Sequence, residues 1–360
     1  MRQIRHARRR AALFCTVVGM LLLCMAVAPR FDAGPAASRA LPARLTDEAF
    51  WRLSQDSSEP GGTFRSLDIT NLTSNEMQSQ WVIPDLAARV PSGAVYLGVG
   101  PEQNFTYIAA LRPSLAVIFD IRRGNLDLQL MYKAIFELCP ERADFVSMLF
   151  SLARPAGVGR DATADALFAA FGRAERSDAL YGRDLQAILD RLTHDHGFTL
   201  APGDAAGIRA VFQTFYESGF AVRASPTYAD LMTATDRGGL ARSFLASEAL
   251  YSAMRDLELR NLVVPVVGDF GGGKAIRAVA GYLKGQGAVV GAFYLSNVEQ
   301  YLEQDGTWGA FCRNVATLPL DGHSTFIRSA SGGGGYGRGP GFVSSLGGMA
   351  DEVRQGCGGS

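Results

Sequence analysis

Cysteine and histidine are scarce in this sequence. Five cysteines and four histidines are spread over 360 residues, and no two cysteines have the C-x-x-C spacing. A dense disulfide scaffold and a zinc site built from cysteines are therefore excluded. His194 and His196 would diverge on a helix, and no third ligand is near them in the sequence, so we interpret both as solvated residues at a helix end. No metal site is predicted.

The sequence also lacks an excess of charge of either sign. Its 35 Lys and Arg residues balance 35 Asp and Glu residues, which removes any general attraction to nucleic acid. Charged residues amount to only 19%, whereas 21 Phe and 11 Tyr are present, a composition typical of a folded protein with a large core. The expected partner is a small-molecule ligand and not nucleic acid, and the oligomeric state stays open.

An apolar run without charge occupies residues 11–28, directly after five arginines. This pattern predicts that residues 1–28 are a signal peptide or an N-terminal membrane anchor, and its 18 residues fall between a signal core and a full membrane span. Because positive charge stays inside, the domain is expected outside the cytoplasm, exported or attached to the membrane through the uncleaved segment. If the leader is not used, the protein is cytoplasmic.

Two further segments are poor in the residues that build a core. Residues 29–45 are rich in Ala, Pro and Arg and are predicted to be a linker. Residues 331–360 contain GGGGYGRGPG and are predicted to be a disordered tail, because so many glycines do not pack. The folded body is therefore expected at 46–330.

Apolar strands alternate with helical patterns at both ends of this body. Strands are predicted at 94–97, 115–119, 262–267, 288–295 and 325–327, and only helical stripes occur at about 160–258. Strand-helix-strand units imply parallel strands joined by right-handed crossovers. The predicted fold class is α/β, with a Rossmann-like, mostly parallel sheet, a long helical insertion and the N-terminal apolar leader. Ligands of such sheets bind beyond the carboxyl ends of the strands.

The turn after the first strand contains Gly98 and Gly100, and Asp120 ends the second strand. Glycines in this turn let a ligand approach the backbone, and an acid after the second strand can accept the hydroxyls of a ribose. The pattern predicts a pocket for a nucleoside-type cofactor. Gln103 stands at the third glycine position of the dinucleotide fingerprint, which disfavours NAD and FAD. The alternative interpretation is a tight turn and a solvated acid.

This layout resembles that of S-adenosylmethionine-dependent methyltransferases. The resemblance implies that Gly98, Gly100 and the turn that follows them, with Glu102 and Asn104, hold the cofactor and that Asp120 holds its ribose. The sequence departs from the family at Glu102, where a third glycine is frequent, and at residue 96, which is a tyrosine where an acid is common.

By the same resemblance, Asp269 would lie in a catalytic loop after a later strand. The segments YLGVGPEQNFTY, VPVVGDF, GAFYLSNVEQYL and STFIRS also resemble an uncharacterised bacterial protein family over most of residues 45–330. That second resemblance implies no activity.

Residues 268–274, GDFGGGK, fit the GxxxxGK spacing of a phosphate-binding loop. Ala275 replaces the hydroxyl residue that would bind magnesium, and Asp269 would place an anion in the phosphate cradle. We therefore interpret the segment as a Gly-rich turn at the rim of the pocket, and nucleotide hydrolysis remains the weaker alternative.

Polar side chains follow several predicted strands, where they can orient a ligand. Arg122 and Asn297 are predicted to contact substrate, and Arg123 is a further cation at the same place. His323 lies beside Asp321 and Ser324, but no GxSxG motif presents a nucleophile, so a loop is expected there.

Two hypotheses follow from these patterns. The first is a methyltransferase-like protein that binds S-adenosylmethionine or a related nucleoside ligand, with Asp269 orienting or deprotonating an acceptor. The second is a non-catalytic exported or membrane-anchored binding protein that retains the fold, because S-adenosylmethionine is made in the cytosol and the leader predicts export.

Overall fold

The computed structural model describes residues 40–63, 71–331 and 342–355, and the predicted leader lies outside them. The described residues belong to one compact unit, which therefore includes the helical insertion. Within the described ranges, no helix combines the length and the apolar character needed to cross a membrane.

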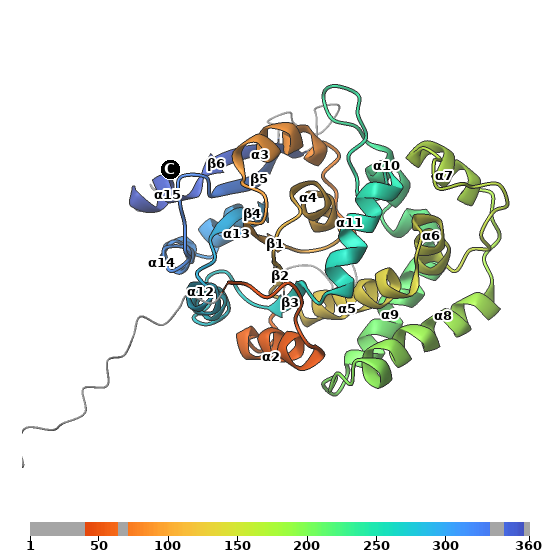
Figure 1. Ribbon diagram of the computed structural model, residues 1–360, viewed down its shortest axis with the longest axis horizontal. Coiled ribbons are helices and arrows are strands. Elements are labelled where there is room, and N and C mark those ends of the chain that lie inside the picture. Colours follow the sequence, from red (N-terminus) through yellow and green to blue (C-terminus); the bar gives the residue numbers. More distant parts are fainter. Residues whose placement is uncertain (1–39, 64–70, 332–341, 356–360) are drawn as a thin grey trace, which may run out of the picture. The chain divides into compact units, whose positions relative to one another are not determined.

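The centre of the fold is a six-stranded sheet with the order β3-β2-β1-β4-β5-β6 (Figure 1). The first five strands in this order run parallel, and β6 pairs antiparallel with β5. The bounds are β1 Val95–Val99, β2 Ala116–Asp120, β3 Val263–Val267, β4 Val290–Ser296, β5 Thr325–Ser331 and β6 Phe342–Gly348.

This order confirms the predicted mostly parallel, Rossmann-like sheet. The chain moves outward from β1 through β2 to β3 and then returns to place β4 on the other side of β1. The order therefore reverses between β1 and β4, which is the topological switch point of a doubly wound sheet. Every residue of β2 and β3 is buried, as expected for strands covered on both faces.

Helices cover the two faces of the sheet (Figure 1). One face is covered by α4, α5 and α11, with α3 beside α4, and the other by α2, α12, α13 and α14. The bounds are α2 Asp47–Ser57, η2 Ser79–Val82, α3 Ile83–Arg89, α4 Gln103–Leu111, α5 Arg123–Leu138, α11 Glu248–Leu259, α12 Ala275–Gly285, α13 Val298–Gln304 and α14 Trp308–Val315.

The helical insertion packs on the far side of α5. Its elements are α6 Arg142–Phe150, α7 Ala164–Phe171, α8 Asp178–Asp190, η3 Arg191–Asp195, α9 Asp204–Ser218, η4 Gly219–Val222 and α10 Tyr228–Thr233. The sequence predicts one apolar stripe on α5, but its residues from Asn125 to Glu137 are all buried, because the insertion covers the side that would otherwise face solvent.

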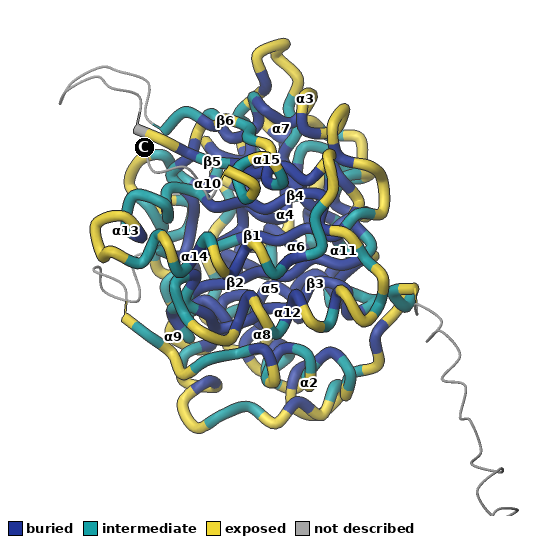
Figure 2. Tube along the Cα trace, turned by 90° about the vertical axis from the view of Figure 1, so that its left-hand side faces the viewer, coloured by how far each residue is buried: buried dark blue, intermediate teal, exposed yellow. Residues whose placement is uncertain are grey.

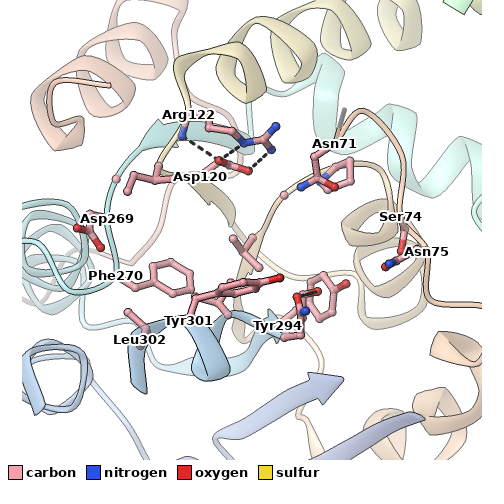
Figure 3. Close-up of a pocket in the computed structure, with 18 of the residues that line it drawn as sticks. Asn71, Ser74, Asn75, Asp120, Arg122, Asp269, Phe270, Tyr294, Tyr301 and Leu302 are labelled. Atoms are coloured by element: carbon pink, nitrogen blue, oxygen red, sulfur yellow. Dashed lines mark hydrogen bonds and ion pairs between the residues drawn. The ribbon is translucent and has the colours of Figure 1, made fainter. Parts of the chain in front are cut away.

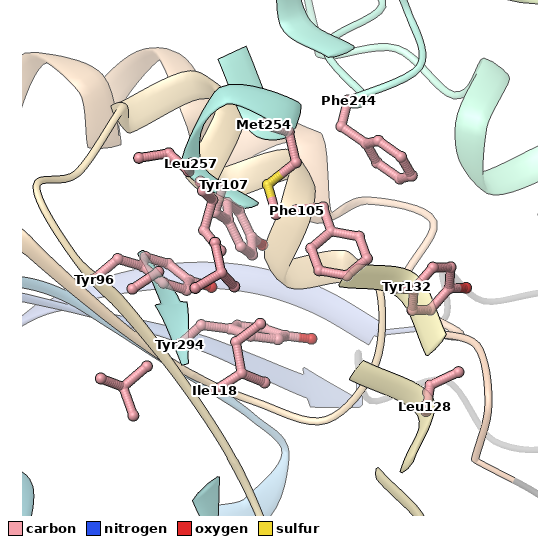
Figure 4. Packing of buried hydrophobic residues seen from close by; sticks show 14 of the residues in the cluster. Tyr96, Phe105, Tyr107, Ile118, Leu128, Tyr132, Phe244, Met254, Leu257 and Tyr294 are labelled. Carbon is pink, nitrogen blue, oxygen red and sulfur yellow. The ribbon is translucent and has the colours of Figure 1, made fainter. Parts of the chain in front are cut away.

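Aromatic rings join the sheet layer to the insertion (Figure 4). Phe105 of α4 makes edge-to-face contacts with Tyr132 and Phe136 of α5 and with Phe244, at ring-centroid distances of 5.0, 5.3 and 5.4 Å. Tyr132 in turn contacts Phe215 of α9. The buried residues continue through strands and helices without a break (Figure 2), so the insertion and the sheet share one core.

The C-terminal segment differs from the prediction. A disordered tail was expected from residue 331 onward, but β6 and the helix α15 Met349–Arg354 lie within it. Met349 is fully buried, and Arg328 of β5 forms an ion pair of 2.6 Å with Glu352. The prediction is wrong for residues 342–355 because the strand edge of β5 provides hydrogen-bonding partners that glycine-rich chain can use. Residues 332–341, which carry most of the glycines, lie outside the described residues.

Candidate functional site

A cavity of about 570 Å³ lies at the carboxyl ends of β1, β2, β3 and β4. Asp120 and Arg122 line one side of it, and Tyr294 and Tyr301 lie across from them (Figure 3). Asp269 and Phe270 are at one end, and Asn71, Ser74 and Asn75 are at the other. The cavity is thus at the switch point of the sheet, where ligands of this architecture bind.

Gly98 and Asn104 hold the turn after β1 in its conformation. A Cβ on Gly98 would lie 1.8 Å from the side-chain oxygen of Asn104, so only glycine fits there. The Asn104 amide donates hydrogen bonds to three consecutive carbonyl groups at 99–101, and its oxygen accepts one from the Tyr96 hydroxyl at 2.9 Å. These two predicted site residues hold the turn in shape and do not line the cavity.

Gly100 is the glycine of this turn that faces the cavity. Its φ is +79°, a left-handed conformation that favours glycine, and a Cβ there would meet no atom within 4 Å. The turn is therefore open at this residue, as a close approach of a ligand to the backbone requires.

Glu102 is fully buried behind the turn and outside the cavity lining. Both of its carboxylate oxygens lie within hydrogen-bonding distance of the Ser74 N–H, at 3.0 and 3.3 Å. Burial raises the pKa of Glu102 to about 7, although this hydrogen bond opposes the shift. Glu102 thus fixes the backbone of Ser74 through this hydrogen bond, and Ser74 is part of the cavity wall.

Asp120 and Arg122 form a closely paired wall of the cavity. Arg122 donates to Oδ1 of Asp120 from its backbone N at 2.9 Å and from Nε at 3.0 Å, and to Oδ2 from Nη2 at 2.7 Å. Arg122 is only 2% exposed, so its charge is balanced inside the protein. A carboxylate offers about four acceptor positions, which leaves one on Oδ2 for a ligand.

The structure brings Asp269 to the same cavity as Asp120. Asp269 follows β3, and its Oδ1 accepts a hydrogen bond of 2.8 Å from the N–H of Gly271. Asn297 also lines the cavity, directly before α13. Arg123 instead forms a two-pronged ion pair with Asp204 of the insertion, at 2.6 and 2.8 Å.

The segment with phosphate-loop spacing encloses a carboxylate of the chain itself. Oε1 of Glu59 accepts the N–H groups of Lys274 and Ala275 at 2.7 and 3.0 Å, and Oε2 accepts that of Asp269 at 3.1 Å. A Cβ on Gly272 would lie 2.5 Å from this carboxylate. The cradle therefore holds Glu59 and is closed to a phosphate, which argues against nucleotide hydrolysis there.

Ser296 is one of the polar residues expected at the ends of the predicted strands, whereas its partner Glu76 was not singled out from the sequence. Ser296 ends β4 with φ +52°, which is strained for a residue other than glycine and is frequent at functional sites. Its hydroxyl lines the cavity wall and donates to Glu76 at 2.5 Å. Glu76 also accepts from the Ser329 hydroxyl, and burial raises its pKa. No local pattern marks Glu76, because it lies in a stretch without apolar periodicity.

The insertion also reaches the cavity, through Arg223, which follows η4. To the strand ends, the segment at 71–75 and the start of α13, the insertion thus adds one cation to the cavity wall. That cation could not be predicted, because its position depends on how the insertion folds back over the sheet.

The two histidines predicted to be solvated differ from each other. His194 is solvated, with 85% of its side chain exposed, but the His196 side chain is only 9% exposed. The His196 ring lies 2.7 Å from a carboxylate oxygen of Asp47 and 2.6 Å from one of Glu137, so it connects α2 to α5. The described residues contain no group of three or more His, Cys, Asp or Glu side chains suited to a metal ion.

A comparison of the chain with curated proteins gives no match. A family model described as "Domain of unknown function (DUF7790)" matches residues 71–340. The match contains every residue of the cavity lining except Phe342. Because it covers well over half of the chain, this protein belongs to the DUF7790 family of domains of unknown function.

Proposed function

We propose that this protein is methyltransferase-like and binds a nucleoside-type ligand in the cavity, with S-adenosylmethionine as the ligand that the motifs predict. The observation that carries the proposal is that Gly100, Asp120 and Asn297 line one cavity at the point where the strand order reverses. Ligands of doubly wound sheets bind at that point.

The volume and the lining residues of the cavity are compatible with such a ligand. In this proposal, Asp120 accepts one ribose hydroxyl on Oδ2, and the open side of Gly100 admits the rest of the ligand close to the backbone. Phe270 adds apolar surface to the cavity wall. A volume of about 570 Å³ is within the usual range for pockets that take small ligands.

The proposed reaction places the methyl acceptor near Asp269. This carboxylate has one oxygen held by the N–H of Gly271, and its other oxygen would orient or deprotonate the acceptor. Methyl transfer depends mainly on the alignment of donor and nucleophile, so few acid–base groups are needed.

The second candidate is a non-catalytic binding protein, exported or attached to the membrane. It is favoured by the way in which the two cavity aspartates are used. Asp120 is paired with Arg122 and Asp269 caps its own loop, so both have structural hydrogen bonds to maintain. Under this alternative the same cavity binds the ligand without chemistry.

Calorimetric titration of the full chain with S-adenosylmethionine tests the binding proposal. Val298 lines the cavity, so Val298→Trp should fill it and abolish binding, whereas Val289→Trp, at a partly exposed position outside the cavity lining, should leave binding intact. No heat and no thermal shift at millimolar ligand would remove S-adenosylmethionine from consideration.

Transfer of a labelled methyl group to a cell extract separates the two candidates. A methyltransferase should label an extract component, and Asp269→Asn should reduce that labelling at least tenfold while retaining ligand binding. Binding without any labelling would favour the non-catalytic protein.

A further inference from the structure

Arg223 differs from the other arginine of the cavity. Arg122 is paired with Asp120, whereas Arg223 has no hydrogen bond or ion pair to any residue within the described ranges, and its Nε is buried without a partner. Arg223 nevertheless lines the cavity. A guanidinium that is partly withdrawn from water is costly unless an anion pairs with it.

The position of Arg223 follows from its neighbours. Arg223 lines the same cavity as Gly100 and Pro101 of the turn after β1, and as Ser74, which lies at one end of it (Figure 3). Asp269 lies at the other end of the cavity, beyond Asp120 (Figure 3). The cavity wall therefore contains both Arg223, a cation without a partner among the described residues, and Asp269, an acidic residue.

We propose that Arg223 binds an anionic group of the ligand, a carboxylate or a phosphate, beside the turn at 99–102. The planar guanidinium can donate two parallel hydrogen bonds to either group. The proposal rests on the proposed function in one respect, that the ligand occupies this cavity. It adds that the ligand carries a negative charge where Arg223 lines the cavity. The insertion, which supplies Arg223, would therefore select ligands with such a group.

The placement of an anionic group at Arg223 agrees with the remaining hydrogen-bond acceptor position on Oδ2 of Asp120. A nucleoside whose ribose is held at Oδ2 of Asp120 would lie in the cavity that Gly100, Arg223 and Asp269 also line. An anionic substituent of this ligand would then pair with Arg223 and stay away from the carboxylate of Asp269.

Calorimetry on the full chain with three ligands tests this inference. S-adenosylmethionine supplies a carboxylate, ADP supplies phosphates, and adenosine supplies neither. Arg223→Gln should weaken the ligand that binds most tightly by about tenfold or more and leave adenosine unchanged. Arg223→Lys should recover part of the loss. Arg209→Gln, an exposed arginine on α9, is the matched control and should have no effect.

The comparison of ADP with S-adenosylmethionine identifies the anion, because the preferred group should show the larger dependence on Arg223. Equal affinity of the parent chain and Arg223→Gln for every ligand would overturn the inference. If no nucleoside binds, the proposed function fails, and thermal shifts with inorganic pyrophosphate and with citrate then decide the inference alone. Stabilisation that is lost in Arg223→Gln but kept in Arg209→Gln would support it, and no such difference would refute it.

Discussion

The Arg122 side chain is only 2% exposed, and Asp120 is an acidic partner that balances its charge. Removing one partner of a buried pair leaves an uncompensated charge, which typically costs about 3–5 kcal/mol. Asp120→Leu should therefore lower the free energy of unfolding by about that amount. The double variant Asp120→Leu/Arg122→Met should recover most of it, because no charge then remains unpaired.

Urea denaturation measures both variants. Equal losses in the single and the double variant would show that the carboxylate acts mainly through other contacts. Substitution of Asp120 would change the stability of the protein as well as any ligand binding, because Asp120 is paired with Arg122. Val298→Trp, which fills the cavity, is therefore the cleaner test of ligand binding.

At the residue scale, the sequence was enough to find the side chains that end a strand or come directly after one. Asp120 and Asn297 are such residues, and both line the cavity. Gly98 fits the motif, yet its role is explained by the Asn104 side chain beneath it, a contact that the motif does not contain. Glu59 and Arg223 could not be predicted, because each reaches the site from a distant segment with no periodic pattern.

At the scale of elements, Glu59 links the segment after α2 to the start of α12 by hydrogen bonds. Three backbone N–H groups donate to its carboxylate, and removing the acceptor would leave them without a partner. Glu59→Ala should lower the free energy of unfolding by about 2–4 kcal/mol. Glu48→Ala, at an exposed position of α2, should change it by less than about 0.5 kcal/mol.

Chemical denaturation of the two alanine variants checks this expectation. A small effect of Glu59→Ala would mean that water or an anion replaces the carboxylate, and a phosphate-dependent recovery of stability would identify the anion. From the sequence, the GxxxxGK segment is interpreted as a Gly-rich turn at the rim of the pocket, but the sequence could not reveal that this turn binds a carboxylate of the same chain.

Element boundaries were predictable where a strand or helix has one uninterrupted pattern. β1 to β4 agree with the sequence analysis to within a few residues. β6 was missed because its segment, FVSSLGG, contains two glycines and two serines and forms a strand only by pairing with β5. Strand formation there is a tertiary effect, which local composition does not report.

At the scale of the whole molecule, His196 joins three segments that are distant in sequence. Burial alone would raise the pKa of Glu137, but the hydrogen bond from His196 and the charge of Lys133 outweigh it and lower the pKa to about 2. A carboxyl group with a lowered pKa in the folded state stabilises the protein above its ordinary value of 4.5, and this contribution disappears as the pH falls toward 2.

Glu137→Gln should therefore be less stable than the parent chain above pH 4.5, and the two should converge as the pH approaches 2. Urea denaturation between pH 2 and pH 7 measures the difference. Glu303→Gln, at an exposed position of α13, should remain close to the parent chain throughout. A gap between Glu137→Gln and the parent that did not change with pH would assign the effect to packing.

The long insertion also determines when the sheet can assemble during synthesis. Ala116 of β2 pairs with Val263 of β3, and the whole helical insertion lies between them in the sequence. On a ribosome, β1 and β2 emerge with both outer edges unpaired, because β3 and β4 both follow the insertion in the sequence. We expect the nascent chain to depend on chaperones over that interval, because non-local strand pairing is slow and leaves apolar edges exposed.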